Sequence, residues 1–419
     1  MSDDPLVTSL ARRSWLVDGP LSFIVSAYLD YLHVQRYADS TIHAYLKALA
    51  HFAYWLKKKG AEAIEVDKPT VELFLNSHLP SCKCPAPRNC YVLVLRAALN
   101  HLLAVLQQQG FACAPQFAPT PVTCELEKFR HYLRDTSGLA ESTCNSRVKH
   151  VSNFLTQCFG SGTVDSSQMT AQDIEDCFVD YATRWKPVSL AIIRTSLKSY
   201  LRFRALRGDQ NQTLVAALPL IADYSQVNLP AALTEAQLDR LLRAFDLDNP
   251  VGQRDYGIAR CLVDLGLRGH EVAHLSLESV DWPTGVLTIT HGKTQRVQQL
   301  PLPVQTGQAI AEYLRHGRPS TSNRRLFVRH RAPFDAPLSV SAIRSILFRA
   351  FRRCGMDEHL YRSHVLRHSL AIRLQRSGAS LKEIADVLRH RNLQATKVYA
   401  KVDLERLRPV ALPWPRRQS

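Results

Sequence analysis

Tyr399 lies near the end of the chain, in the stretch RHRNLQATKVYAKV, nine positions after His390. A tyrosine in a folded protein usually packs against its neighbours. Its phenol can also act as a nucleophile that forms a covalent intermediate. The spacing alone does not decide between packing and chemistry, so the other candidate residues have to be considered with it.

Three further features could do chemistry, and each has an ordinary structural explanation. In GLRGHEV, Glu271 follows Arg268 by about one helical turn and could hold its guanidinium, as in many structural ion pairs. In HVLRH, His364 and Arg367 project from one face of a helix, which is also the pattern of an exposed basic helix. Lys293 lies at the tip of an expected hairpin, where a lysine is usually just solvated.

The order of these residues along the chain is more specific than any one of them. The ordered set is Arg268, Lys293, His364, Arg367, His390 and Tyr399. This order, in the motifs GLRGHEV, HVLRH and LRHRNLQATKVYAKV, resembles the tyrosine recombinases, the phage integrase family, over about 233–405 and more loosely over 118–210. Two positions depart from the family pattern. Arg389 stands where the family usually has glycine, and His270 where it more often has serine or a small residue.

The resemblance implies that Tyr399 attacks a DNA phosphodiester and forms a 3′-phosphotyrosine. Arg268 and Arg367 would stabilise the charge that develops on the non-bridging oxygens, because guanidinium groups are permanently charged and bind phosphate as a fork. The implied reaction uses no metal, ATP or other cofactor. The arginines supply the electrostatic stabilisation that a two-metal site would otherwise give, and the phosphotyrosine retains the bond energy.

The remaining residues of the set would move protons or support the others. His364 and His390 would donate further hydrogen bonds or handle the phenol proton, and Lys293 would protonate the leaving 5′-oxygen as general acid. Glu271 would hold the first arginine. Arg389, in the glycine position, would alter the loop or bind DNA through a phosphate contact.

The charge balance indicates a polyanionic partner. The 419 residues include 53 Lys and Arg against 37 Asp and Glu, a formal net charge of +16. Such a surplus favours DNA, because neutralising phosphates releases condensed counterions. We find neither a membrane-spanning apolar run nor a signal-peptide pattern, so we expect a cytoplasmic protein with no membrane partner. The ten cysteines are expected to be reduced.

Helical periodicity dominates the first two hundred residues and contains an internal echo. The stretches 37–56 and 139–158 share an A-[DE]-S-T start and then place apolar residues at matching positions. We interpret the echo as two copies of a small helical domain, although any two amphipathic segments align to some extent. In the C-terminal part, GVLTIT (285–290) and RVQQLPLP (296–303) predict two strands joined by a turn.

These patterns predict a mainly α protein with a small antiparallel β-sheet in its C-terminal domain. The expected segments are an N-terminal helical domain (1–112), a helical core-binding domain (118–210), a linker (211–232) and an integrase-like catalytic domain with a C-terminal tail (233–419). Capping boxes at Thr234 with Gln237 and at Ser380 with Glu383 are expected to start two helices of the catalytic domain.

The resemblance also implies a clamp, in which a helical domain and the catalytic domain close around double-stranded DNA. Candidate phosphate contacts on 118–210 are Arg147, Lys149, Arg194 and Lys198, although helix surfaces carry such residues routinely. Domain 1–112 would bind arm-type DNA sites or contact a partner recombinase. The tail would dock onto a neighbouring subunit, in a homotetramer on DNA or in an assembly with related recombinases.

The stretch HLPSCKCPAPRNC places His78, Cys82, Cys84 and Cys90 close together. Four nitrogen and sulfur ligands could bind structural zinc. However, the Cys-x-Cys spacing differs from the usual Cys-x2-Cys, and reduced surface thiols in a proline-rich loop are common. The sequence therefore favours ordinary thiols and keeps zinc as a candidate.

The sequence leaves three functions open. The first is a site-specific recombinase or integrase of a mobile element. The second is a type IB topoisomerase-like enzyme, which uses the same catalytic residue types. The third is a non-catalytic DNA-binding accessory subunit. The linked helical clamp favours the first over the second, and the complete catalytic set argues against the third.

Overall fold

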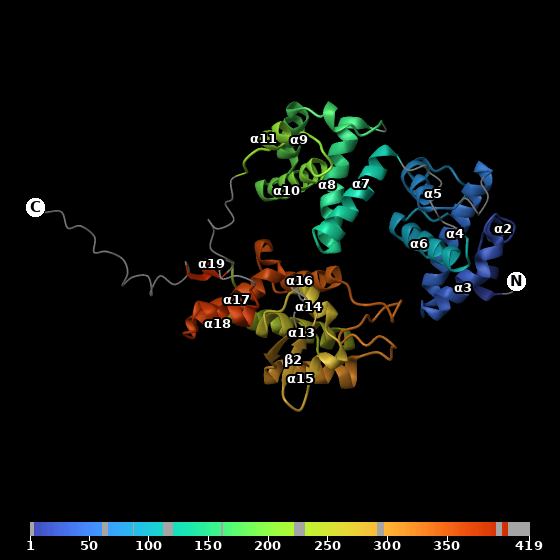
Figure 1. The fold of residues 1–419 in the computed structure, drawn as a ribbon. Helices are drawn as coiled ribbons and strands as arrows, with labels where there is room; N and C mark the ends of the chain where they lie inside the picture. The colour runs from blue at the N-terminus through green and yellow to red at the C-terminus, as the bar shows by residue number, and fades with distance from the viewer. Residues whose placement is uncertain are drawn as a thin grey trace, which may run out of the picture. The chain divides into compact units, whose positions relative to one another are not determined.

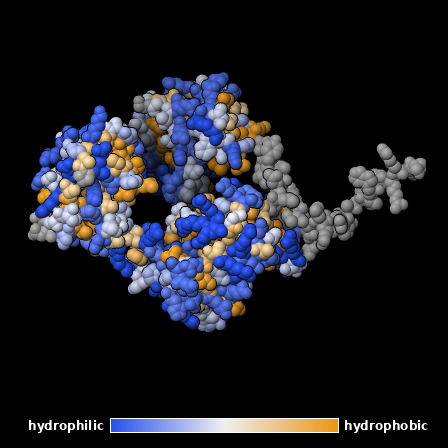
Figure 2. Space-filling view, turned by 180° about the vertical axis from the view of Figure 1, so that it is seen from behind, coloured by the Kyte–Doolittle hydropathy of each residue, from blue (hydrophilic) through white to orange (hydrophobic). Residues whose placement is uncertain are grey.

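The fold is mainly α, with one three-stranded antiparallel sheet in the C-terminal part of the chain (Figure 1). This computed structural model describes residues 4–60, 66–86, 88–111, 120–160, 162–221, 231–290, 297–390 and 396–400. The expected hairpin turn with Lys293 and the tail after Ala400 lie outside them. Among the described helices, none combines the length and apolar character that a membrane span needs. On the face seen in Figure 2, hydrophilic residues predominate.

The chain divides into two units, 1–115 with 229–419 and 116–228. Three main hydrophobic cores form within it, one among residues 7–106, one among 122–218 and one among 233–366. A fourth, smaller cluster draws on residues 370–399. Each core is built from helices or a sheet with one apolar face, so each can be described by itself.

Helices of different lengths surround the first core. They are α1 (Pro5–Thr8), α2 (Arg13–Val17), η1 (Ser22–Ile24), α3 (Val25–Val34), α4 (Asp39–Lys59), α5 (Lys68–Leu73), η3 (Phe74–His78), η4 (Leu79–Ser81) and α6 (Val92–Gln108). Helix α4 contributes more buried residues than its neighbours and packs along α6. The N-terminal segment is therefore a helical bundle organised around α4.

The second core is helical as well. Its elements are α7 (Pro121–His131), η5 (Tyr132–Thr136), α8 (Glu141–Phe159), η6 (Ser166–Gln168), α9 (Ala171–Arg184), α10 (Pro187–Ala205) and α11 (Gln212–Ala217). Helix α11 differs from our expectation, because it lies inside the range assigned as linker. Leu214 and Leu218, four positions apart, are buried in this core and anchor α11 against α9. Ordered structure therefore extends beyond 210.

The echo in the sequence produces the same local structure twice. Helices α4 and α8 both begin at the acidic residue of the A-[DE]-S-T stretch, after an extended alanine at the N-cap. The acidic side chain lies in the first turn, where it interacts favourably with the helix dipole. The matching apolar residues are buried in both copies, and α4 packs on α6 as α8 packs on α10. A common origin of the two copies stays a prediction.

The third core combines the helices of the C-terminal segment with the sheet. The helices are α12 (Glu235–Arg243), α13 (Pro250–Asp264), α14 (Gly269–His274), η7 (Leu277–Ser279), α15 (Val304–Glu312), η8 (Tyr313–Gly317), α16 (Val340–Arg353), η9 (Glu358–Leu360), α17 (Ser363–Arg376), α18 (Leu381–Leu388) and α19 (Lys397–Ala400). The strands are β1 (Val280–Asp281), β2 (Val286–Ile289) and β3 (Gln298–Pro301), in that order in the sheet.

Local signals in this segment are confirmed. Strands β2 and β3 pair antiparallel with Leu287 opposite Leu300, so two buried leucines share the core face. Both capping boxes form: Thr234 with Gln237 begins α12, and Ser380 with Glu383 begins α18. Helix α13 is central and packs against α15 and α17.

The turn between α13 and α14 requires a glycine. Gly266 has φ +56°, in the left-handed region, and an added Cβ would lie 2.8 Å from Leu370 Cδ2 and 3.0 Å from Leu388 Cδ2. Helices α17 and α18 therefore approach the backbone of the turn closely. This approach brings the end of α13 next to the residues predicted to be catalytic.

Replacing Gly266 by alanine should lower the free energy of unfolding by more than backbone strain alone. The left-handed conformation costs about 1 kcal/mol, and overpacking against the two leucines adds about 1–3 kcal/mol. Urea unfolding measures the loss. Gly355→Ala is the control, because Gly355 has φ +59° with nothing within 4 Å of an added Cβ. Equal losses in both variants would contradict close packing at the turn.

Candidate active site

Arg268 is the N-cap residue of α14 and is fixed by a carboxylate one turn later. Its backbone N–H donates to Oε2 of Glu271 (2.7 Å), and its Nη1 donates to Oε1 of the same residue (2.8 Å). The Glu271 side chain is 1% exposed, whereas that of Arg268 is 23% exposed. The expected contact is therefore present, and the Arg268 side chain remains partly exposed.

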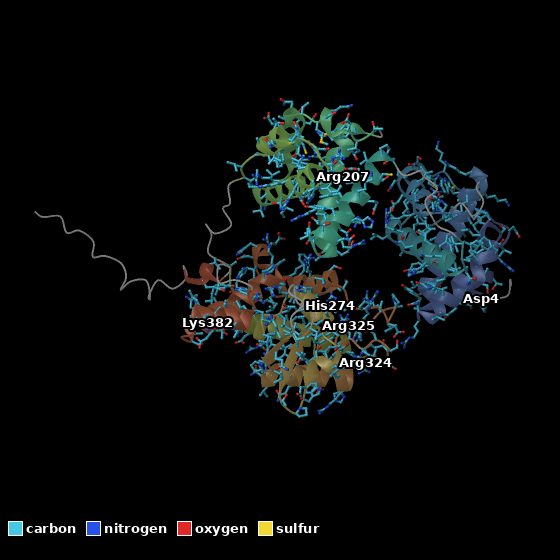
Figure 3. All side chains as sticks on the ribbon, viewed as in Figure 1. Asp4, Arg207, His274, Arg324, Arg325 and Lys382 are labelled. Atoms are coloured by element: carbon cyan, nitrogen blue, oxygen red, sulfur yellow. The ribbon has the colours of Figure 1, made fainter. Side chains whose placement is uncertain are left out.

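The C-terminal end of α14 is tied down from a different part of the chain. Arg325 Nη1 donates to the carbonyl of His274 (2.6 Å), and both side chains are labelled in Figure 3. Ser276 forms an antiparallel bridge with Arg325, and the backbone N–H of Leu326 donates to the carbonyl of Leu275 (2.8 Å). These contacts fix the short helix at its far end.

Arg389 corrects one of our expectations. We expected Arg389 to alter the loop or to contact phosphate. Its side chain is only 2% exposed, and its Nη2 donates to Oε2 of Glu271 (2.9 Å). Its Nη1 donates to the carbonyls of Val387 (3.0 Å) and Leu265 (3.4 Å). The Arg389 guanidinium is therefore turned toward the protein interior and paired with Glu271.

The backbone conformation of Arg389 is one that favours glycine. Arg389 follows α18 with φ 55° and ψ 49°, a left-handed conformation that ends the helix. For a residue with a Cβ this conformation costs about 1 kcal/mol. The Arg389 guanidinium pairs with Glu271 and so links the end of α18 to α14.

Glu271 stays ionised although it is buried. Burial opposes ionisation, but Arg389 and then Arg268 favour the charged form, and together they leave the pKa of Glu271 below its usual value. One carboxylate therefore holds two guanidinium groups, one on each oxygen.

Arg367 projects from α17 into the same region. It is buried, its Nη1 donates to the carbonyl of Gly266 (2.5 Å), and its Nη2 donates to the carbonyl of Leu388. Arg389 also donates to the Gly266 carbonyl (3.3 Å). Burial, with Arg268 and Arg389 nearby, lowers the pKa of Arg367 to about 9, so it remains charged at neutral pH.

Tyr399 lies on α19 and packs against α17 and α18 within its own chain. It is 1% exposed and belongs to a small cluster with Leu370 and Leu388. Its hydroxyl is 2.8 Å from Nδ1 of His368. Burial raises the pKa of Tyr399 to about 12, and Arg367 partly opposes this rise. The phenol is therefore protonated at neutral pH and has a hydrogen-bond partner.

His368 is the site residue that we did not predict from the sequence. Burial, His364 and Arg367 lower its pKa to about 4, so the ring is neutral and can accept a hydrogen bond from the phenol. The signal was present in HVLRH, because His368 lies one turn after His364 on the same helix face. The rings of these two histidines are 6.5 Å apart, and His364 is exposed.

His390 lies beside the same positive charges. Its Nδ1 is 2.7 Å from Oγ1 of Thr396, and its pKa is lowered to about 4 by burial, Arg367 and Arg268. Arg268, Arg367, His390 and Tyr399 thus share one neighbourhood, bordered by His364. The role of each stays a prediction, and Lys293 lies outside the described residues.

The candidate DNA contacts lie on two helices of the second core. Lys149 and Lys198 are exposed, whereas Arg147 and Arg194 are half-buried. Arg147, on α8, donates from Nη1 to Oγ of Ser199 on α10 (3.0 Å). The two lysines are therefore the freer pair for binding phosphate.

Removing the charge of Glu271 should be costly. Glu271→Gln leaves two largely buried guanidinium groups without their carboxylate, and breaking a buried pair costs about 3–5 kcal/mol of unfolding free energy. Glu278→Gln is the matched control: Glu278 pairs with Arg324 at the surface, where such pairs contribute at most about 1 kcal/mol. Similar losses in both variants, measured by chemical denaturation, would argue against the network.

Two histidines of the candidate site, His368 and His390, have a low pKa and predict an acid-sensitive fold. Below the unfolded pKa of about 6.5, the unfolded chain binds protons that folded His368 and His390 do not bind until about pH 4. Stability should therefore fall as the pH falls from about 6.5 to 4, by up to about 1.4 kcal/mol per pH unit for each histidine.

His368→Asn should reduce this slope by about one proton in urea unfolding measured across that pH range. The control variant is His359→Asn, which removes an exposed histidine outside the site. An unchanged slope in His368→Asn would show that His368 is protonated in the folded protein at the same pH as in the unfolded chain.

Comparison with known proteins agrees with the motifs. The model of the phage integrase family matches residues 231–406. The putative integrase/recombinase y4rA of Sinorhizobium fredii (strain NBRC 101917 / NGR234) is 35% identical over 402 residues, covering 95% of each chain. Tyrosine recombinase XerD of Ralstonia nicotianae (strain ATCC BAA-1114 / GMI1000) is 27% identical, covering 70% of this chain and 96% of XerD.

Solved structures share the fold. The XerH site-specific recombinase, in a post-cleavage complex with its palindromic difH substrate, is 18% identical with a TM-score of 0.54, covering 84% of this chain and 98% of XerH. The Tn1549 transposon integrase, in complex with transposon right end DNA, is 18% identical with a TM-score of 0.52, covering 68% of this chain and 99% of that one. The extensive identity to y4rA, together with the family match, shows that the chain belongs to the phage integrase family of tyrosine recombinases.

Proposed function

We propose that this tyrosine recombinase is the site-specific recombinase or integrase of a mobile element, and that it breaks and rejoins DNA through a 3′-phosphotyrosine. The observation that carries the proposal is the placement of Tyr399 against His368 and beside Arg367, within one chain. The Tn1549 integrase, similar in fold, is described with transposon DNA, which supports the mobile-element setting.

In the proposed reaction the phenol oxygen of Tyr399 attacks phosphorus, and the 5′-oxygen of the DNA leaves. The raised pKa of Tyr399 makes the free phenolate rare at neutral pH. The proton should therefore depart as the new bond forms, and neutral His368, with its Nδ1 at 2.8 Å, is positioned to accept it as general base. Lys293 is our candidate for returning a proton to the 5′-oxygen.

The arginines would stabilise the charge on the phosphate. Arg367 is held by two backbone carbonyls and Arg268 by Glu271, so both guanidinium groups are fixed before the substrate arrives. Charged groups that are already in place in a partly buried site stabilise a transition state without having to rearrange during the reaction. We propose His390 and His364 as further donors to the phosphate oxygens, and a reaction without metal or ATP.

Double-stranded DNA is the proposed partner, since the XerH and Tn1549 neighbours are described bound to DNA. We propose that residues 118–210 form the second half of a clamp, with Lys149 and Lys198 as the first phosphate contacts. The net charge of +16 suits this role. We further propose that the protein acts in the cytoplasm, as a tetramer or with related recombinases, and that 1–112 binds further DNA or a partner.

A nicked suicide substrate carrying the element's own end tests the chemistry, because the fragment lost at the nick prevents religation. Wild type should accumulate a covalent protein–DNA adduct, visible after denaturing electrophoresis. Tyr399→Phe should bind the DNA in a gel shift and form no adduct, because the nucleophilic oxygen is gone.

Tyr361→Phe is the matched control. The Tyr361 hydroxyl donates to the carbonyl of Met356 (2.8 Å), outside the site, so this variant should form the adduct. Adduct formation by Tyr399→Phe would refute the assignment. Relaxation of any supercoiled plasmid without site preference would favour the topoisomerase alternative.

A further inference from the structure

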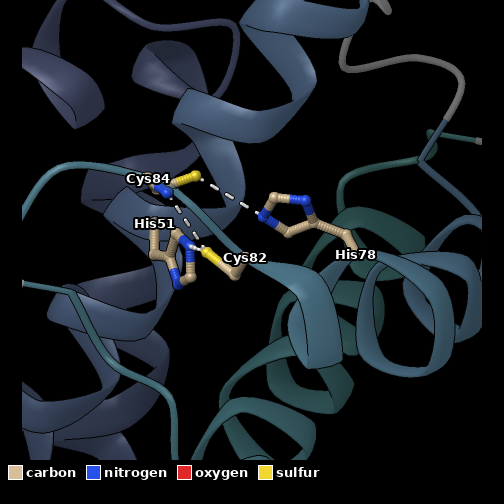
Figure 4. Close-up of side chains that lie close together, drawn as sticks. All are labelled: His51, His78, Cys82 and Cys84. Atoms are coloured by element: carbon tan, nitrogen blue, oxygen red, sulfur yellow. Dashed lines mark hydrogen bonds between the residues drawn. The ribbon is translucent and has the colours of Figure 1, made fainter.

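Four metal-binding side chains converge in the N-terminal helical segment. They are His51, His78, Cys82 and Cys84 (Figure 4). Their nearest ligand atoms all lie within 4.8 Å of one another. His51 comes from the middle of α4 and His78 from the end of η3, while the two cysteines follow η4. The group lies far along the chain from every residue of the candidate active site.

We propose that these four side chains bind one structural zinc ion. Tetrahedral zinc has bonds of about 2.3 Å to sulfur and about 2.1 Å to nitrogen, which place neighbouring sulfur and nitrogen ligands about 3.6 Å apart. Cys82 Sγ is 3.3 Å from His51 Nε2, and Cys84 Sγ is 3.5 Å from His78 Nε2. Both separations fit the edges of such a tetrahedron.

The surroundings of His51 orient it as a ligand. Its Nδ1 is 2.8 Å from the carbonyl of Asn89, so the ring proton on Nδ1 is donated to that oxygen. The lone pair then lies on Nε2, the atom that faces Cys82. A backbone carbonyl on the far nitrogen is the usual support of a zinc-bound histidine. A histidine that only filled space in the core would not need its second ring nitrogen to face a thiol.

The set of ligands also balances charge. Two thiolates neutralise the two positive charges of zinc, and the histidines remain neutral, so the closed site carries no net charge. His51 is fully buried and Cys84 is buried, and an uncharged site can be buried without an unpaired ion. The backbone N–H of Cys84 further donates to Cys82 Sγ (3.5 Å). Two nitrogens and two sulfurs with four protein ligands suit a structural zinc site rather than a catalytic one.

This set differs from the one that the sequence suggested. Cys90 was a candidate ligand, but it is exposed and does not belong to the group, and His51 supplies the fourth position. His51 lies within an apolar stretch of α4, where the sequence offers no sign that it faces the cysteines. The unusual Cys-x-Cys spacing is accommodated because the two sulfurs meet histidines from different elements.

Zinc would fasten a loop to the bundle. Residues 82–86 and 88–90 form no helix or strand and follow a proline-containing turn. The loop contacts α4 through Asn89, whose carbonyl accepts from His51 Nδ1 (2.8 Å) and whose Nδ2 donates to the carbonyl of Ala44 (3.5 Å). A metal bound by α4, η3 and the loop would hold these three parts together and stabilise the folded segment, as structural zinc does in small domains. The proposal does not depend on the recombinase reaction.

Metal analysis of the full chain tests the proposal. Wild type purified without chelator should carry about one zinc per chain. Cys84→Ser and His51→Gln should each carry about tenfold less zinc per chain than wild type, or less still. Cys90→Ser is the matched control, a thiol of the same loop outside the group, and should keep the zinc. Two results would overturn the proposal. One is wild type that carries no zinc after dialysis against a zinc-containing buffer, and the other is a Cys90→Ser variant that loses as much zinc as the two ligand variants.

A second measurement on wild type covers variants that fail to fold. Protein stripped with a chelator and loaded with Co²⁺ should show thiolate charge-transfer absorption and the intense d–d bands of tetrahedral coordination. Zinc should displace these signals and raise the melting temperature of the stripped protein. Cobalt bands of octahedral oxygen coordination, without thiolate absorption, would contradict the site.

Discussion

The candidate active site depends on one buried carboxylate placed between two arginines. Glu271 fixes Arg268 at the start of α14 and Arg389 at the end of α18, so it joins two parts of the chain that are distant in sequence. The free-energy cost of removing this charge from water is offset only because both of its oxygens are paired. The network thereby orients Arg268 and closes the turn around Gly266, whose carbonyl receives Arg367.

Tyr399 depends on the same framework from the other side. Helix α19 packs on α17 and α18, and the phenol meets His368 from the helix that also carries Arg367. His368 and His390 are kept neutral by burial among positive charges, while the arginines remain charged. Groups with opposed protonation states, held close together, are what a general base and a charge stabiliser require. This geometry is our reason for proposing phosphoryl chemistry at this neighbourhood rather than at another basic surface.

Local chemistry made much of this predictable from the sequence. Capping boxes, the β2–β3 pairing and the Arg268–Glu271 contact all depend on residues close together in the chain. Contacts between residues that are distant in the sequence were missed or wrongly assigned. Arg389 was expected at DNA because its charge was visible in the sequence, whereas its burial against Glu271 was not. His368 and His51 were overlooked because their partners, Tyr399 and Cys82, come from other elements.

The central claim is that one chain supplies both the nucleophile and the arginines that surround the phosphate. Mixing Tyr399→Phe protein with Arg367→Ala protein on the suicide substrate tests it most directly, since each variant lacks what the other retains. If one chain supplies both, the mixture should form no covalent adduct, while either variant mixed with wild type should form one. An adduct restored in the mixture would show that the tyrosine acts from a neighbouring subunit, and would contradict the site described.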